Sequence, residues 1–202
     1  MITREKFDFI KDKYGHYSSW AIWAHENPEK PKSNLGDLTV LDPDKNKDLL
    51  SKLNPNVVLV ALNFSRGAVK YPLGNFHEYH PHGTDYKTRY ALRDTAWWGG
   101  YMTDILKDFN EKESGKVSAF LRKNKQFEQK NVETFREELI DLGSKNPIII
   151  AFGKQVYDIL ERNFPEFKII KIPHYAHRIN KEKYREQVST IWRKTTKKSE
   201  NS

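Results

Sequence analysis

The chain has 202 residues, 35 lysines and arginines against 27 aspartates and glutamates, a formal net charge of +8, and no cysteine. The lack of cysteine excludes disulfides, thiol catalysis, cysteine-ligated zinc and iron–sulfur clusters, and it is compatible with a reducing cytoplasm. No segment approaches the 18 apolar residues of a membrane span, and 37% hydrophobic residues are enough for a packed core. We expect one soluble, cytoplasmic, monomeric domain over residues 1–202 that does not enter a membrane.

The first quarter of the chain predicts a helix followed by a packed aromatic arm. Apolar side chains recur at helical spacing within residues 1–14, and three large aromatic residues follow: Tyr17, Trp20 and Trp23. A loop rich in Pro, Asn and Lys runs to about residue 36, and residues 44–53 predict a short helix. We expect residues 1 to about 54 to form an N-terminal arm on the domain.

Four apolar runs bounded by breaker residues predict buried strands. They cover 57–62, 100–106, 147–152 and 168–172. Helical periods lie near 89–96, 115–123, 132–142, 154–163 and 181–193. Strands that alternate with helices predict an α/β fold, here a three-layer sandwich with a central, mainly four-stranded parallel sheet flanked by helices.

Two loops leave the carboxyl ends of predicted strands, 63–88 after the first strand and 173–180 after the fourth. Ligands of parallel α/β sheets bind at this edge. The net positive charge favours a polyanionic partner, and part of the excess lies in a basic tail over about 194–202. A polyanion-binding site at the carboxyl edge is therefore the first expectation.

Two segments of this chain resemble motifs of the uracil-DNA glycosylase superfamily. In VVLVALNFSRG a strand ends at Asn63 before a glycine-bearing loop, as in the first motif of that superfamily. In KIIKIPHYAHRIN a strand ends in His174, with Arg178 four residues later, which resembles the second motif, particularly in the single-strand-selective members. Three shorter matches lie between them, NFH at 75–77, YMTDILK at 101–107 and FGKQVYDIL at 152–160. The resemblance covers roughly residues 55–190 in the right order.

The chain also departs from the family pattern. Phe64 and Ser65 stand where Pro-Gly is usual, and Tyr175 and Ala176 stand where Pro-Ser is usual. Asp104 replaces the Asn with which the family reads the base. An ionised Asp only accepts hydrogen bonds, whereas Asn both donates and accepts. The identity of the base is therefore open.

The resemblance implies a DNA glycosylase that hydrolyses the N-glycosidic bond of a flipped, deaminated or modified base in single- or double-stranded DNA, with no cofactor. It implies a water-orienting role for Asn63 and a hydrogen bond from His174 to the base, as the catalytic pair. It assigns base contacts to Phe64, Phe76 and Asp104. It assigns DNA contacts to Arg66, His177, Arg178 and Lys181.

Each of these residues also has a plainer interpretation. Asn63 could cap a turn, His174 could bond its own loop, and Phe76 could pin its loop to the core. Asp104 could face an exocyclic amine, be protonated, or pair with an arginine, Arg89 or Arg93. His177 and Arg178 could lie in an exposed polar turn.

Basic residues near the predicted site could contact phosphates without reading sequence. This predicted basic rim comprises Arg66, Lys70, Lys87, Arg89 and Arg93. A solvated surface is the alternative, and a noncatalytic nucleic-acid-binding module is the alternative function.

A different chemistry is suggested by the loop that holds His77, His80, His82 and Asp85. Imidazole and carboxylate groups at such close spacing are ligand types for zinc or manganese in metal-assisted hydrolysis. The alternative is that these polar residues stabilise the loop or face the substrate. A metal-dependent hydrolase is therefore a third hypothesis, and no metal is expected under the first two.

Overall fold

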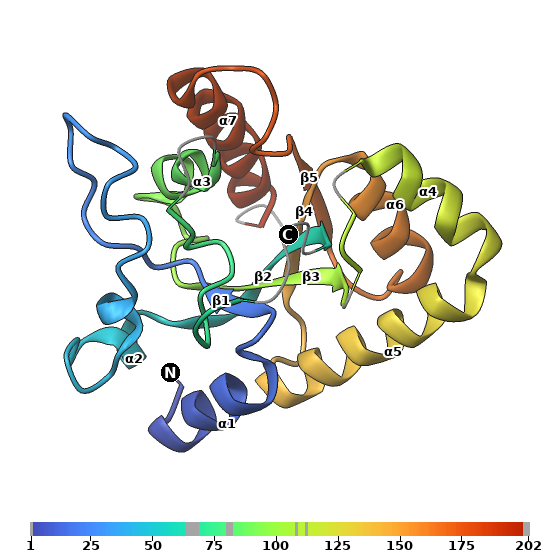
Figure 1. Cartoon of the computed structure of the whole chain (residues 1–202), viewed down its shortest axis with the longest axis horizontal. Coiled ribbons are helices and arrows are strands. Elements are labelled where there is room, and N and C mark those ends of the chain that lie inside the picture. Colours follow the sequence, from blue (N-terminus) through green and yellow to red (C-terminus); the bar gives the residue numbers. More distant parts are fainter. Residues whose placement is uncertain (1, 64–68, 80–82, 108, 112, 200–202) are drawn as a thin grey trace.

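The computed structural model describes residues 2–63, 69–79, 83–107, 109–111 and 113–199. In this part of the chain the protein is an α/β structure with one five-stranded sheet, in the strand order β1-β3-β2-β4-β5 (Figure 1). The strands are β1 Ser18–Trp20, β2 Asn54–Asn63, β3 Gly100–Leu106, β4 Ile148–Phe152 and β5 Ile169–Ile172. The helices are α1 Arg4–Tyr14, α2 Leu49–Lys52, α3 Asp85–Leu92, α4 Ser114–Lys123, α5 Lys125–Leu142, α6 Lys154–Asn163 and α7 Lys181–Ser199, with a 3-10 turn at Leu38–Leu41.

The four predicted strands are confirmed as β2 to β5, and they are parallel to one another. The predicted number of strands is wrong, because β1 adds a fifth strand that pairs antiparallel with β3. It was missed because it has only three residues, all buried, and so shows no alternation of exposed and buried side chains. Part of the predicted N-terminal arm is thus an edge strand of the central sheet.

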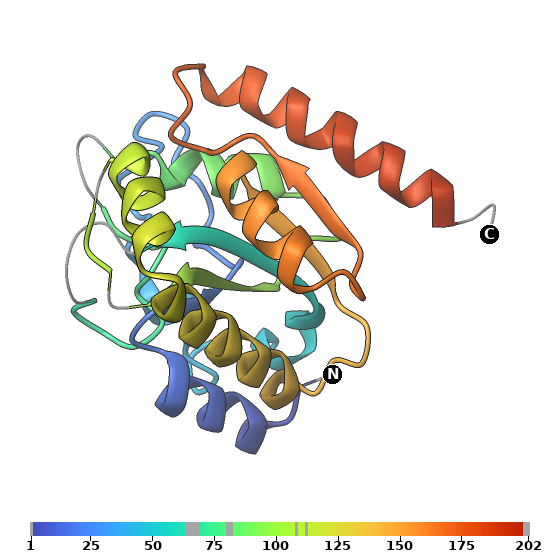
Figure 2. The ribbon, with the colours of Figure 1, turned by 90° about the vertical axis from the view of Figure 1, so that its right-hand side faces the viewer.

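The boundaries of two helices, α3 and α7, differ from those predicted from the sequence. Helix α3 begins at Asp85 rather than near residue 89, so the end of the long loop that was predicted over 63–88 is helical. Helix α7 extends to Ser199 and takes up most of the predicted basic tail. Both helices pack side by side on one face of the sheet (Figures 1 and 2).

The sheet separates two apolar cores because successive side chains of a strand point to opposite faces. On β2, Val58 and Val60 face the core that contains residues of α1, α5 and α6. Val57 and Leu59 face the second core, which contains residues of α3 and α7. Both faces of the sheet are covered by helices, which explains why the parallel strands are continuous apolar runs.

The parallel strands bring their carboxyl ends to one edge of the sheet. Asn63 at the end of β2 is in register with Leu106 at the end of β3, and Phe152 of β4 with Ile172 of β5. The segments that follow these residues therefore start close together in space, although they are far apart in the sequence.

A buried ion pair holds the end of β3. The Lys107 ammonium lies 2.5 Å from a carboxylate oxygen of Glu138 on α5, and the two side chains are 6% and 0% exposed. Glu138 also accepts a 2.8 Å hydrogen bond from the Tyr101 hydroxyl. Lys107 donates to the Thr103 hydroxyl at 2.8 Å and to the Asp104 carbonyl. These contacts fix the backbone at Asp104.

Lys107→Met should destabilise the protein strongly, because it leaves Glu138 buried without its cation. The expected loss is about 3–5 kcal/mol in the free energy of unfolding, measured by urea denaturation. The double variant Lys107→Met/Glu138→Leu should recover most of that loss. The exposed pair of Lys154 with Asp158 provides the control, and Lys154→Met should cost less than about 1 kcal/mol. Equal losses for the two single variants would contradict the account.

Candidate functional site

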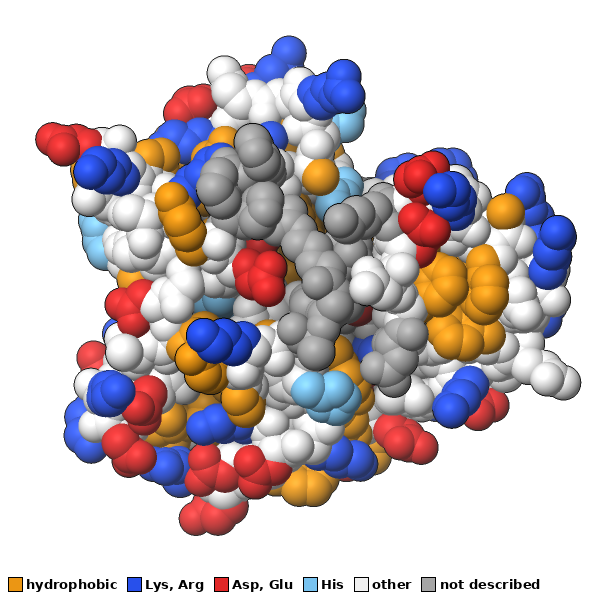
Figure 3. Space-filling view, in the orientation of Figure 1, with side chains coloured by type: hydrophobic (Ala, Val, Ile, Leu, Met, Phe, Trp, Pro, Cys, Tyr) orange, Lys and Arg blue, Asp and Glu red, His pale blue; other side chains and the backbone are white. Residues whose placement is uncertain are grey.

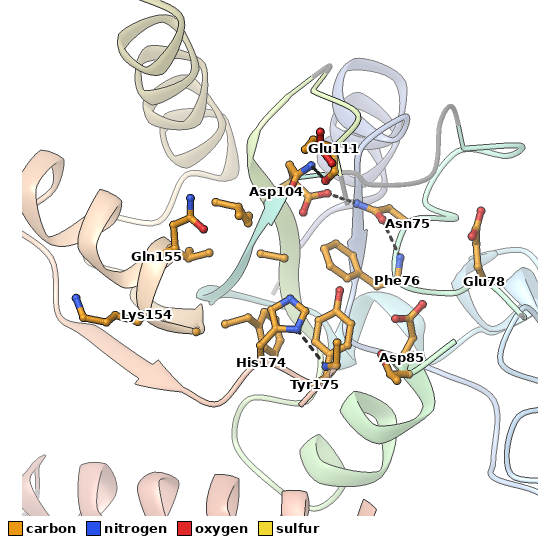
Figure 4. A pocket seen from close by; sticks show the side chains of 18 residues that line it. Asn75, Phe76, Glu78, Asp85, Asp104, Glu111, Lys154, Gln155, His174 and Tyr175 are labelled. Carbon is orange, nitrogen blue, oxygen red and sulfur yellow. Dashed lines mark hydrogen bonds between the residues drawn. The ribbon is translucent and has the colours of Figure 1, made fainter. Parts of the chain in front are cut away.

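A pocket of about 450 Å³ lies at the carboxyl edge of the sheet (Figure 4). Its volume is in the range of small-molecule sites. Six separate segments line it: the end of β2, the loop at 75–78, the start of α3, β3 with the segment after it, the junction of β4 and α6, and the segment after β5. Four residues singled out from the sequence, Asn63, Phe76, Asp104 and His174, line this one pocket.

Asn63 is half-buried and its amide group is fixed by the chain. Its Nδ2 donates hydrogen bonds of 2.8 Å to the carbonyls of Phe109 and Glu111. Two carbonyl acceptors identify this atom as the nitrogen, so Oδ1 points the other way. Asn63 thus holds the segment after β3, and its amide oxygen is an acceptor on the pocket wall. The turn that it was predicted to cap lies outside the described residues.

Phe76 is held in an unusual backbone conformation. Its φ of +65° is left-handed, which costs a bulky residue on the order of 1–2 kcal/mol. Its N–H donates to Asn75 Oδ1 at 3.0 Å, and its carbonyl accepts from the Trp23 indole at 3.1 Å. The ring is 5% exposed and lines the pocket near Tyr175 (Figure 4). Phe76 therefore fixes its loop to the core and also forms part of the pocket wall.

Asp104 is the most deeply buried carboxyl group in the described lining, with 2% exposure. Asn75 Nδ2 donates to its Oδ2 at 2.8 Å and also to the Tyr17 carbonyl at 2.8 Å. Burial raises the pKa of Asp104 to about 7, against the opposing effects of the Asn75 hydrogen bond and the Lys107 charge. At neutral pH the group therefore exchanges readily between its acid and its carboxylate.

The alternative in which Asp104 pairs with Arg89 or Arg93 is wrong, since no ion pair joins them among the described residues. The Arg89 guanidinium instead donates to the carbonyls of Ala24 and Pro31 and to the side chain of Asn34. Arg89 is fully buried by these contacts. It therefore belongs to the packing of the N-terminal segment and not to an exposed basic rim.

His174 presents a neutral imidazole. Its Nδ1 accepts a 3.1 Å hydrogen bond from the Ala176 N–H, so the neutral ring carries its proton on Nε2. Burial lowers the pKa of His174 to about 4. The ring stacks on Tyr175 with 4.4 Å between centroids. His174 does bond its own loop, as the plainer interpretation expects, and this bond leaves Nε2–H as the donor.

The start of α6 completes the pocket beside His174. Gly153 precedes this helix with φ +92°, a conformation that favours glycine, and a Cβ there would lie 3.5 Å from that of His174. No side chain caps the first turn of α6. This wall of the pocket is therefore rich in N–H donors.

Three of the predicted DNA contacts, His177, Arg178 and Lys181, lie outside the described pocket lining. His177 and Arg178 are exposed in the segment after β5. Lys181 pairs with Glu26 at 2.6 Å and lies over the Tyr90 ring. Phe64 and Arg66 lie outside the described residues. Figure 3 shows blue and red side chains intermixed over the face seen in Figure 1, with no single basic patch among those that it colours.

Of the predicted metal set, two residues, His77 and Asp85, lie in the described part of the chain. His77 is 2% exposed, with Nε2 2.9 Å from the Ile22 carbonyl and Nδ1 3.1 Å from the Ser19 hydroxyl. Its ring stacks on Trp23, and burial lowers its pKa. Asp85 lines the pocket at the start of α3, whereas His80 and His82 lie outside the described residues. Within the described residues no group of three potential ligands could hold a metal ion.

Sequence reasoning missed the acidic residues that share the pocket with Asp104, namely Glu78 and Glu111, and the role of Asn75 as the partner of Asp104. Asp85 was named only as a metal ligand. Nothing in the local sequence connects Asn75 with a strand residue 29 positions later. The NFH match includes Asn75, but it predicted a role for Phe76 and none for Asn75.

Asp104→Asn should alter the pH dependence of stability. The carboxyl group has an ordinary pKa of 3.8 in an unfolded chain and about 7 in the folded protein. The folded state thus holds the extra proton between these values, and its stability falls as the pH rises from 4 to 7. Over this window Asp104→Asn should gain on the order of 4 kcal/mol in unfolding free energy relative to the native protein.

The measurement is urea denaturation of both proteins at pH 4, 5.5, 7 and 8. Glu137→Gln, on the exposed surface of α5, is the control and should keep a constant difference from the native protein. A constant difference for Asp104→Asn as well would show that the Asp104 pKa is not raised.

No protein-family model, curated protein or solved structure matches the chain. None of the helices in the described residues is long and apolar enough to span a bilayer. Indications of function therefore come from the pocket and from the sequence motifs whose residues line it.

Proposed function

We propose that this protein is a DNA glycosylase that hydrolyses the N-glycosidic bond of a flipped, deaminated or modified base. The observation that carries the proposal is the meeting of Asn63, Phe76, Asp104 and His174 in one pocket, from four distant segments. The resemblance to the uracil-DNA glycosylase superfamily, including its three-layer sandwich, supports the same proposal. The reaction requires a surface on which the base stacks, a hydrogen-bond donor to the base and a site for water, and residues of these kinds line the pocket.

In this proposal the base enters the pocket and stacks on Phe76. The His174 Nε2–H donates a hydrogen bond to an acceptor atom of the base. A neutral imidazole with its proton fixed on Nε2 stabilises charge that develops on the base without first losing a proton. The fixed tautomer also means that the donor is in place before the substrate arrives.

Water attacks C1′ of the sugar as the glycosidic bond breaks. Asn63 Oδ1 and the Asp104 carboxylate are acceptors on the pocket wall that can orient this water. The bond electrons pass to the base, the water oxygen bonds to C1′, and its proton passes to solvent. The step needs no covalent nucleophile and no metal, and the carboxylate stabilises the positive charge that develops on the sugar.

His174→Ala should lower base release by about 100-fold, because one preorganised donor is lost from the transition state. DNA binding should change by no more than a few-fold, since the donor acts mainly on the departing base. The assay follows free bases by mass spectrometry after incubation with oligonucleotides that carry different modified bases. His25→Ala, an exposed histidine that does not line the pocket, is the control and should keep the native rate.

Asn63→Ala should also reduce release strongly, and circular dichroism would check its fold because Asn63 also holds the segment at 109–111. If the native protein binds the oligonucleotides but releases no base, the glycosylase proposal is wrong and the noncatalytic binding module replaces it.

Arg178→Ala should weaken DNA binding and reduce its dependence on salt. An exposed arginine that contacts a phosphate releases about one counterion on binding, so the slope of log K against log salt should fall by roughly one. Fluorescence anisotropy of a labelled oligonucleotide at several salt concentrations measures both quantities. Arg122→Ala, on the exposed end of α4, is the matched control. Identical slopes for the Arg178 variant and the native protein would exclude the phosphate contact.

A further inference from the structure

Lys87 is a buried cation that binds the backbone rather than a carboxylate. It lies near the start of α3, two residues after Asp85, which lines the pocket. It was predicted to belong to an exposed basic rim, but it is only 6% exposed. Its ammonium donates a hydrogen bond of 3.0 Å to the carbonyl of His177. Lys87 therefore faces the segment that carries His174 and is largely shielded from solvent.

The charge of Lys87 opposes folding. Among the described residues no carboxylate lies within ion-pairing distance of its ammonium. Burial lowers the pKa of Lys87, and the positive charge of Lys32 lowers it further. A lysine whose pKa is lower in the folded protein than in the unfolded chain destabilises the fold while it is charged. A buried cation with such a cost is typical of a position that serves function rather than stability.

Backbone hydrogen bonds connect Lys87 to His174. The His177 N–H donates to the His174 carbonyl at 2.9 Å, which closes a turn over residues 174–177. Within this turn the Ala176 N–H donates to His174 Nδ1 at 3.1 Å, so the ring proton is on Nε2. Lys87 binds the carbonyl at the end of the turn. It therefore holds the turn from which the imidazole points into the pocket (Figure 4).

Tyr184 holds the same segment on the other side of His174. Its hydroxyl donates to the Pro173 carbonyl at 3.0 Å, and the residue is 1% exposed on α7. Pro173 directly precedes His174. The imidazole thus has one anchor before it, from α7, and one after it, from α3, and these two helices pack against each other. The position of His174 depends on both helices.

We infer that Lys87 and Tyr184 are positioning residues that hold the His174 Nε2–H where it meets the departing base, an inference that rests on the proposed glycosylase function. Neither residue belongs to the described pocket lining, so both act through His174 and not on the substrate. A donor of this kind lowers the barrier only when it is in place before the reaction. A misplacement of about 1 Å can lower a rate by on the order of 100-fold.

The variants Lys87→Met and Tyr184→Phe remove the two anchors with little change in shape. In Lys87→Met the His177 carbonyl keeps a 2.8 Å hydrogen bond from the Ile179 N–H, so it is not left without a donor. Because a buried charge is also removed, the urea midpoint of this variant should equal or exceed that of the native protein. Tyr184→Phe keeps the buried ring and provides a second test if Lys87→Met folds poorly.

Base release, measured by mass spectrometry of free bases, tests whether the anchors act through His174. Lys87→Met should lower release at least 10-fold and Tyr184→Phe several-fold. Lys130→Met makes the same charge change as Lys87→Met on the exposed surface of α5 and should keep the native rate. Adding either anchor variant to His174→Ala should cause no further loss, because the donor is already absent. Additive losses would overturn the inference.

The salt dependence of DNA binding separates positioning from a phosphate contact. Lys87→Met should leave the slope of log K against log salt unchanged, because the ammonium binds the His177 carbonyl and not the DNA. Fluorescence anisotropy of a labelled oligonucleotide at several salt concentrations measures this slope. A slope reduced by about one would identify Lys87 as a phosphate contact and would overturn the positioning role.

An NMR titration of His174 tests the inference without catalysis. Burial lowers the pKa of this ring to about 4 in the native protein, and the charge of Lys87 is not among the causes. Loss of the charge alone should therefore leave the titration midpoint unchanged. If Lys87 holds the turn, Lys87→Met should expose the ring to solvent and raise the midpoint to about pH 5 or higher.

An unchanged His174 midpoint together with a native rate of base release in Lys87→Met would overturn the inference. The NMR result also separates this inference from the function on which it rests. A raised midpoint would support the positioning role even if the native protein released no base, and the absence of release would count against the proposed function alone.

Discussion

The hydrogen bond from Asn75 to the buried carboxyl group of Asp104 is the contact on which the account of this site depends. It joins the loop after β2 to β3, and the same amide also donates to the Tyr17 carbonyl beside β1. The other atom of that amide accepts from the N–H of Phe76, whose backbone is left-handed. One asparagine thus positions both the acceptor and a stacking ring, and connects them to the N-terminal part of the chain.

The opposite wall of the pocket is built by different means and has the opposite polarity. There backbone groups position the side chain. The Ala176 N–H fixes the tautomer of His174, and the left-handed Gly153 turns the chain so that α6 begins beside the His174 ring. The pocket of about 450 Å³ thus has a buried acceptor, Asp104, and a fixed donor, His174, in its lining. This pair favours a polar ligand.

The elements of this fold that could be predicted from the sequence are those marked by a local pattern of apolar residues. The apolar runs of β2 to β5 are long and bounded by breakers, so their burial and parallel order could be inferred. Strand β1 could not, because three residues show no period, and its burial depends on β3, more than 80 positions away. In the site, Asn63 and His174 were found because they end strands. Asn75 and the ion pair of Lys107 with Glu138 were not, because contacts between distant segments leave no local signal.

The central claim is that an extruded base occupies this pocket, and a crystal structure with trapped DNA tests it most directly. The duplex would carry one 2′-fluoro nucleotide with a deaminated base, and the fluorine makes its glycosidic bond resist cleavage. The account predicts that the base lies against Phe76 and Tyr175, with one polar atom within hydrogen-bonding distance of Asp104 and an acceptor atom facing His174 Nε2. A base that remains stacked in the duplex, or that binds elsewhere on the protein, would contradict it.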